Sequence, residues 1–147
     1  MVLTSPAFEN DGLIPEQYTC AGKSINPPLV IEGIPEKTAS LVLVVESYGA
    51  SEIGHVHWLV FNIPPVVQIA EDSIPGQQGT NDFFGKLNYS GPCPRGGVSR
   101  YFFKLYAADR MLAVGEGAGK KEVERAMRGH ILARAKLVGS TKGLGVQ

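Results

Sequence analysis

The sequence predicts a mainly β, loop-rich fold with one helix near its C-terminal end. The 18 glycines and 10 prolines make up nearly a fifth of the 147 residues. Short runs of β-branched and aromatic residues lie between them, a pattern that favours strands joined by tight loops. Only residues 120–135 place apolar side chains at helical spacing, with charged side chains around the other side. Gly129 weakens this predicted helix and could kink it.

Five apolar runs predict the strands. In chain order they are Leu29–Glu32, Leu41–Glu46, His55–Asn62, Tyr101–Ala107 and Lys136–Ser140. Because strand side chains alternate, Tyr101 and Phe103 should share one face of their strand, with Lys104 and Tyr106 on the other. Residues 3–26 and 66–88 show little periodicity, and long irregular segments of this kind are often functional.

Composition and charge narrow the class of protein. Basic and acidic residues both number 14, so no basic excess indicates a nucleic-acid partner. The longest apolar run, about residues 41–45, is too short to span a bilayer, and no secretory signal is visible. We therefore expect one domain over residues 1–147, located in the cytoplasm. In that setting Cys20 and Cys93 are expected to be free thiols.

A loop rich in glycine and proline leads into the aromatic strand at 101–107. Glycines such as Gly91 would let a ligand approach the backbone, and prolines such as Pro94 would fix the shape of the loop. Cys93, between two prolines, is expected to be an unreactive thiol. The same pattern is equally typical of a tight turn into a core strand.

His55 and His57 are two residues apart on a predicted strand and could hold one metal ion. No Glu, Asp or His follows within residues 59–67 to complete a metal site. An enzyme or metalloprotein that uses His55, His57 and Glu46 is therefore the least favoured interpretation. One polar and one packed histidine is the simpler interpretation.

Four polar residues on or near the predicted strands could converge on a small anion: Glu46, His57, Ser99 and Tyr101. Protonated histidine, serine and tyrosine would donate hydrogen bonds, and Glu46 would orient His57. A Ser–His–Glu triad is disfavoured, because Ser99 does not lie in a nucleophile elbow.

Several motifs together resemble the phosphatidylethanolamine-binding protein family, in particular its bacterial and archaeal Raf kinase inhibitor-like branch. The motifs that carry the resemblance are Ser5–Phe8, Tyr18–Gly22, Asn26–Leu29, His57–Pro64, Tyr89–Pro94, Arg100–Ala107 and Ala126–Leu132. The resemblance implies two antiparallel sheets with Greek-key connections and a C-terminal helix. It also implies a non-enzymatic protein without a cofactor, whose surface pocket binds phosphate-type or carboxylate anions such as phospholipid headgroups. The alternative it implies is a regulator of a kinase or serine protease with a vestigial pocket. Because bacterial members of this family are commonly homodimers, the resemblance also implies a homodimer.

The sequence departs from the family pattern at three pocket positions. Glu46 and Tyr48 stand where the family has aspartates, and Ser99 stands where it has histidine. His57 and Tyr101 remain. A charge-assisted hydrogen bond contributes about 1.5–3 kcal/mol and a neutral one about 1 kcal/mol. We therefore expect a retained but altered pocket with weakened affinity for anions, built from Glu46, Tyr48, His55, His57, Gly91, Cys93, Pro94, Ser99 and Tyr101.

Overall fold

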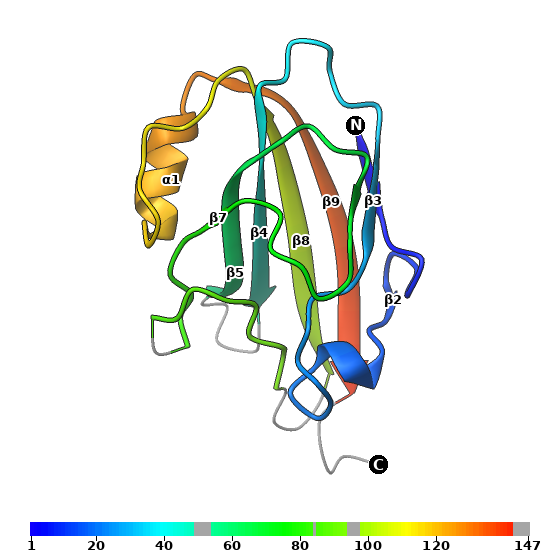
Figure 1. Cartoon of the computed structure of the whole chain (residues 1–147). Helices are drawn as coiled ribbons and strands as arrows, with labels where there is room; N and C mark the ends of the chain where they lie inside the picture. Colours follow the sequence, from blue (N-terminus) through cyan, green and yellow to red (C-terminus); the bar gives the residue numbers. More distant parts are fainter. Residues whose placement is uncertain (49–53, 84, 94–97, 143–147) are drawn as a thin grey trace.

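The protein is built from two β-sheets and one α-helix (Figure 1). The computed structural model describes residues 1–48, 54–83, 85–93 and 98–142. For residues 98, 99 and 142 it describes the backbone but not the side chain. The small sheet has the order β1-β3-β6 and the large sheet β2-β9-β8-β4-β5-β7. The strands of the small sheet are β1 (Val2–Thr4), β3 (Leu29–Glu32) and β6 (Gln68–Ile69). Those of the large sheet are β2 (Gly12–Leu13), β4 (Ser40–Tyr48), β5 (Gly54–Ile63), β7 (Gln77–Gln78), β8 (Val98–Ala108) and β9 (Ile131–Lys142).

The predicted two-sheet, mainly β architecture is confirmed. β4 pairs with β5 and β8, and β8 with β9, all antiparallel. The long connection from β5 to β8 brings β8 back beside β4, as in a Greek-key arrangement. One edge pair departs from the antiparallel pattern, because β2 pairs with β9 in parallel. The segments without periodicity supply the short strands and the 3-10 helix η1 (Glu16–Tyr18).

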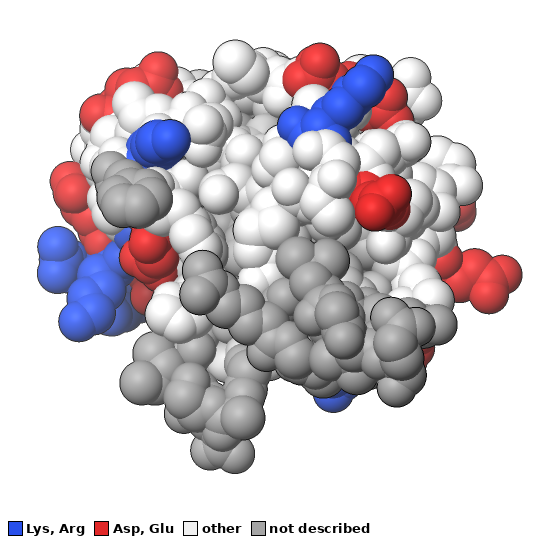
Figure 2. Space-filling model, turned by 90° about the horizontal axis from the view of Figure 1, so that it is seen from below, with Lys and Arg blue, Asp and Glu red and all other residues white. Residues whose placement is uncertain are grey.

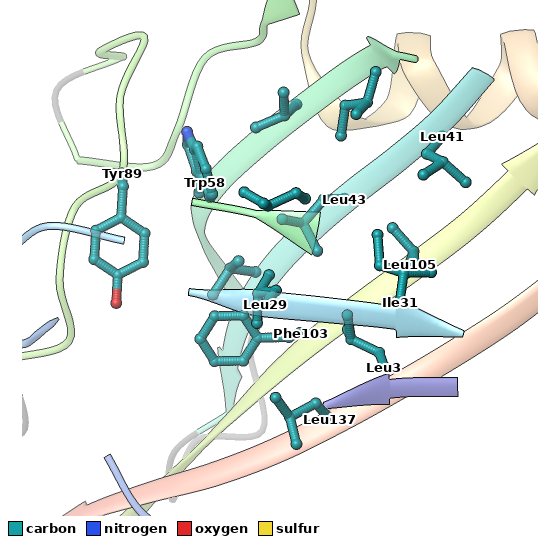
Figure 3. Close-up of a cluster of buried hydrophobic side chains, with 14 of the residues drawn as sticks. Leu3, Leu29, Ile31, Leu41, Leu43, Trp58, Tyr89, Phe103, Leu105 and Leu137 are labelled. Carbon is teal, nitrogen blue, oxygen red and sulfur yellow. The ribbon is translucent and has the colours of Figure 1, made fainter. Parts of the chain in front are cut away.

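The main core lies between the two sheets (Figure 3). β4 runs through the middle of the large sheet, and its residues 41–45 are at most 2% exposed. Alternation sends Leu41 and Leu43 into this core, together with Phe103 and Leu105 of β8, as predicted. Leu29 and Ile31 reach the same core from the small sheet. Because β4 is buried on both faces, residues 41–45 are all apolar and do not alternate with polar residues.

A second apolar cluster lies on the outer face of the large sheet. Val123 and Met127 of α1 (Lys120–Met127) pack there against Val42, Val44 and Phe61. The helix therefore covers the β4 and β5 part of this face, as Figure 1 shows. The outer face is thus the second side on which β4 is buried.

The predicted extent of the helix is wrong. It ends at Met127 instead of continuing to about residue 135, and β9 begins at Ile131. Gly129 has φ +82°, a left-handed conformation that glycine adopts at little cost and that ends a helix. Residues 131–135 carry alternating side chains that pair with β8, so pairing overrides the helical pattern.

Candidate functional site

His57 occupies an irregular position in β5. Val45 pairs with Trp58 and Glu46 pairs with Val56, so β5 carries one extra residue at this point, which is His57. A β-bulge of this kind redirects a side chain relative to regular alternation. It turns His57 toward the inter-sheet side, next to Tyr101, instead of toward the outer face that Val56 and Leu59 occupy. Regular alternation would put His57 on the same face as Leu59, and the bulge prevents this.

Both ring nitrogens of His57 are engaged. Nδ1 lies 2.8 Å from the carbonyl oxygen of Ser90, and Nε2 lies 2.7 Å from the hydroxyl of Ser47. A carbonyl only accepts hydrogen bonds, so Nδ1 carries the proton and, in the neutral ring, the Ser47 hydroxyl donates to Nε2. The residue is 2% exposed. Burial lowers its pKa to about 4, partly offset by the bond to Ser90, so the imidazole is neutral near pH 7.

Aromatic rings enclose the imidazole on two sides. The ring of Phe83 lies 4.6 Å from that of His57, and Tyr101 meets it edge-on at 5.4 Å. Ser47 of β4 pairs with Tyr101 of β8, so two neighbouring strands and the bulge bring the serine, the phenol and the imidazole together. Figure 2 shows the molecule from below, and most of the Lys, Arg, Asp and Glu side chains drawn there lie toward the edge of the view.

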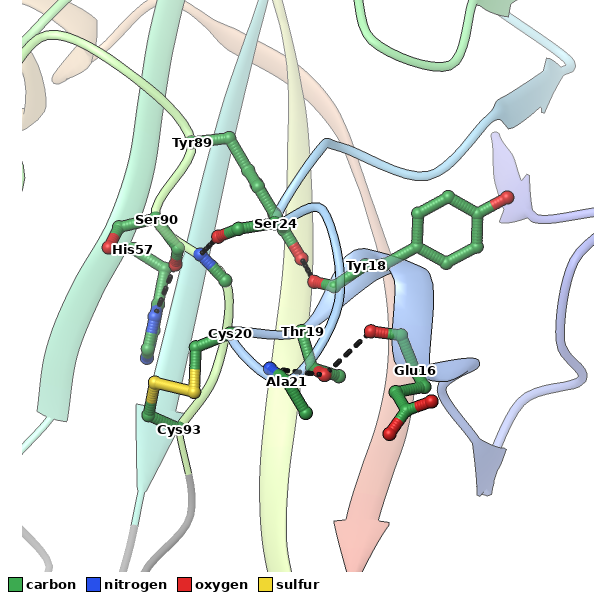
Figure 4. Close-up of a disulfide and its surroundings, with 11 residues drawn as sticks. Glu16, Tyr18, Thr19, Cys20, Ala21, Ser24, His57, Tyr89, Ser90 and Cys93 are labelled. Atoms are coloured by element: carbon green, nitrogen blue, oxygen red, sulfur yellow. Dashed lines mark hydrogen bonds between the residues drawn. A yellow bond between two sulfur atoms is a disulfide. The ribbon is translucent and has the colours of Figure 1, made fainter.

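The loop at residues 89–93 packs against the segment after η1 (Figure 4). The hydroxyl of Tyr89 donates to the carbonyl of Tyr18 at 2.7 Å, and the Gly91 amide donates to the hydroxyl of Ser24 at 2.7 Å. A Cβ on Gly91 would lie 2.6 Å from that hydroxyl and 2.9 Å from the Tyr18 carbonyl oxygen. The glycine is therefore required for close packing of two loops, whereas the sequence suggested close approach of a ligand.

Cys20 and Cys93 form a disulfide across the same contact, with their Cα atoms 5.3 Å apart. The prediction of two free thiols is wrong, because 73 residues separate the cysteines in sequence while the packed loops bring them together. The Cys20 amide also donates to the carbonyl of Pro92 at 3.0 Å. Disulfides are typical of oxidising compartments and of intracellular proteins of hyperthermophiles. A cytoplasmic location stays a prediction. None of the helices in the described residues is long and apolar enough to cross a membrane.

Glu46 and Tyr48 lie on the opposite, outer face of the large sheet. Glu46 is 2% exposed and binds two lysines: Lys104 of β8, at 3.1 Å, and Lys120, at the start of α1. The ring of Tyr48 meets Phe102 edge-on at 5.3 Å. The expectation that Glu46 orients His57 is thus wrong, and Ser47, the next residue along β4, does so instead.

The remaining predicted site residues are only partly brought together. His55 is exposed, with its ring 6.4 Å from Phe83. Ser99 pairs through its backbone with Thr141, and its side chain lies outside the described part of the structure, as does the whole of Pro94. Within the residues described, no group of three or more His, Cys, Asp or Glu side chains could hold a metal ion.

Sequence reasoning missed Ser47, Phe83 and Ser90 as neighbours of His57. Ser47 directly follows the predicted strand Leu41–Glu46. Continued alternation along that strand assigns Ser47 to the inner face, and this signal could have identified it. Phe83 and Ser90 come from the long connection between β5 and β8, whose course depends on tertiary packing. The arrangement as a whole is a buried, neutral hydrogen-bonding group at the ends of three strands.

Comparison with known proteins agrees with this architecture. The family model described as "Phosphatidylethanolamine-binding protein" matches residues 4–142. A UPF0098 protein of Methanothermobacter thermautotrophicus is 44% identical, with 95% of this chain and 97% of the relative covered. One from Pyrococcus abyssi is 47% identical, over 95% of this chain and 84% of the relative.

Two crystal structures have the same fold. A putative phosphatidylethanolamine-binding protein homologue from Chlamydia trachomatis has a TM-score of 0.90 at 38% identity, covering 96% of both chains. YbcL of E. coli, described as a new member of the mammalian PEBP family, has a TM-score of 0.84 at 24% identity, covering 95% of this chain and 96% of its own. At that identity YbcL supports the fold alone. With a family model matching almost its whole length and relatives above 40% identity, this chain belongs to the phosphatidylethanolamine-binding protein family.

Proposed function

We propose that this chain is a non-catalytic binding protein that takes up a small phosphate-type or carboxylate anion beside Ser47, His57 and Tyr101. The observation that carries the proposal is the convergence of these three polar groups from β4, β5 and β8. Buried polar groups cost free energy unless they are satisfied. Apolar side chains would be less costly to bury at these strand ends. The presence of three polar groups there therefore favours a role in binding. The family relationship supports the same assignment.

The hydrogen-bonding pattern determines how an anion would bind. With Nδ1 donating to Ser90, the neutral ring presents Nε2 only as an acceptor, and that position is filled by the Ser47 hydroxyl. An anion needs donors. It would gain two if His57 took up a proton on Nε2 and the Ser47 hydroxyl rotated away from the ring. We therefore expect anion binding to be coupled to protonation of His57.

Isothermal titration calorimetry with acetate tests this coupling, because a carboxylate stays ionised from about pH 5.5 to 7.5. Since the pKa of His57 is about 4 without ligand, the dissociation constant should rise about tenfold for each pH unit in this range. Titrations in buffers of different ionisation enthalpy should show proton uptake. O-phosphorylethanolamine and inorganic phosphate, titrated in parallel, distinguish a headgroup ligand from a free anion.

Substitutions locate the site. Ser47→Ala and His57→Gln should weaken binding, and His57→Gln should also remove its pH dependence. His55→Gln is the matched control, because His55 is exposed on the same strand and contributes less than burial to the lowered pKa of His57. Its replacement should change binding and its pH dependence far less than His57→Gln does. Binding that does not depend on pH, or that survives His57→Gln unchanged, would contradict the proposal.

A further inference from the structure

A second feature lies on the other side of the large sheet, where α1 does not reach. The outward-facing side chains of β8 and β9 include Phe102, Lys104 and Tyr106, with Arg134 and Lys136 opposite them. Arg134 and Lys136 are exposed, and the other three are partly exposed. The apolar cluster under α1 extends only as far as Tyr106 and Ile131 on this side. This part of the sheet therefore presents its side chains to the surface.

The surface here is hollowed. A cavity of about 310 Å³ is lined by Lys104, Tyr106, Arg134, Ala135 and Lys136. Its volume is at the lower end of the range for small-molecule sites. The lining combines three cations with the phenol of Tyr106 and the aliphatic stems of the lysines. Ala135 contributes backbone, because its side chain packs against the main core on the inner face.

The lining carries excess positive charge in an arrangement that is unfavourable by itself. Lys104 pairs directly with Lys136 across the two strands, and like charges at such positions destabilise a sheet. Glu46 forms an ion pair with Lys104 at 3.1 Å, but its single negative charge is shared with Lys120. Neither Arg134 nor Lys136 has an acidic partner within ion-pair distance in the described residues, although Lys136 lies 5.8 Å from the ring of Phe102.

We propose that this cavity binds a small organic dianion, namely a phosphomonoester group attached to an apolar or aromatic moiety. The guanidinium of Arg134 and the ammonium groups of Lys104 and Lys136 would hold the phosphate oxygens through charge-assisted hydrogen bonds. The ring of Tyr106 and the aliphatic stems of the lysines would contact the apolar moiety. Such a ligand relieves the repulsion between the two facing lysines. The site lies on the opposite sheet face from His57 and does not depend on the function proposed there.

Phenyl phosphate is the probe, with inorganic phosphate as the probe that lacks the apolar part. In ¹⁵N-labelled protein, titration with phenyl phosphate should shift the amide resonances of β8 and β9 around residues 104–106 and 134–136. Calorimetry should give a tighter dissociation constant for phenyl phosphate than for inorganic phosphate, because only the former contacts Tyr106. The His57→Gln variant should retain this binding, which separates it from the anion site on the inner face.

The variant Arg134→Gln/Lys136→Gln should weaken phenyl phosphate binding at least about tenfold, which corresponds to about 1.4 kcal/mol. Its matched control is Lys121→Gln/Arg125→Gln, which removes the same charge from exposed positions of α1 that do not line the cavity. Equal weakening in both variants would mean general charge attraction and overturn the proposal. So would the absence of saturable binding, amide shifts confined to residues around Ser47 and His57, or concentration-dependent dimerisation that buries this face.

Discussion

At the scale of single residues, the β-bulge at His57 has the largest consequence for function. It places a titratable ring in an almost fully buried position and gives both nitrogens a partner. The ring is held neutral because burial penalises its charged form. A neutral buried histidine differs from the protonated anion donor that the sequence suggested, and it makes the stability of the fold depend on pH.

We expect His57 to destabilise the fold in acid. Its pKa is lowered from 6.5 to about 4 in the folded protein, so between these values the unfolded chain binds more protons. Stability that is fully present above pH 6.5 is therefore lost as the pH falls toward 4. Urea unfolding at pH 7.5 and pH 4.5 should show that His57 accounts for a loss of about 2–3 kcal/mol.

The difference between variants isolates this contribution from that of the carboxylates. His57→Gln should lose less stability on acidification than the unmodified protein, whereas the exposed control His55→Gln should lose nearly as much as the unmodified protein, because burial is the largest cause of the His57 shift. Equal losses in all three proteins would show that His57 does not titrate between these pH values.

At the scale of elements, the loop at residues 89–93 depends on a contact far away in the sequence. Its carbonyl at Ser90 fixes the tautomer of His57, and Tyr89 and Gly91 bond to the segment at 18–24. The Cys20–Cys93 disulfide closes the same contact. The position of the His57 partner therefore depends on two loops packing correctly, and not on the strands alone.

Removal of the disulfide should lower the free energy of unfolding by about 2–4 kcal/mol, because it closes a long loop in the unfolded chain. The variant Cys20→Ser/Cys93→Ser, compared with the unmodified protein by urea unfolding, measures the effect. Adding a thiol reductant should bring the unmodified protein to the stability of the variant and leave the variant unchanged. If the reductant left the free energy of unfolding of the unmodified protein unchanged, the protein would not contain the disulfide.

At the scale of the whole molecule, Glu46 joins three elements. Its carboxylate on β4 binds Lys104 of β8 and Lys120 of α1, so it connects the helix to the sheet. Burial lowers the pKa of each lysine, but the interactions with Glu46 outweigh this effect and raise it. Both lysines therefore stay charged near neutral pH, and the carboxylate is buried among positive groups.

Glu46→Gln should lower the free energy of unfolding by about 1–3 kcal/mol. Breaking a fully buried ion pair costs about 3–5 kcal/mol, and the lower figure allows for solvent screening of the partly exposed lysines. Glu124→Gln is the matched control, because Glu124 is 49% exposed and lies 3.9 Å from the same Lys120. Chemical unfolding should show little change for the control. Equal effects of the two substitutions would mean that Glu46 acts as an ordinary surface charge.

Much of the architecture could be predicted from local pattern. The strands at Leu29–Glu32, Leu41–Glu46 and His55–Asn62 are predicted within two residues of their observed bounds, because their burial leaves a continuous apolar or alternating signature. The helix was placed correctly at its start but not at its end, where pairing with β8 overrides the spacing. The family motifs supplied the two-sheet arrangement.

The sequence by itself determined most of the long strands, the start of the helix and the family, because alternation, glycine and proline placement and motif spacing act over a few residues. Only the tertiary structure decided which side chains meet. A single extra residue in β5 turned His57 to the inner face while Glu46 stayed on the outer face. Loop packing joined cysteines 73 residues apart. Such outcomes depend on register and long-range contacts, and neither leaves a local trace in the order of the amino acids.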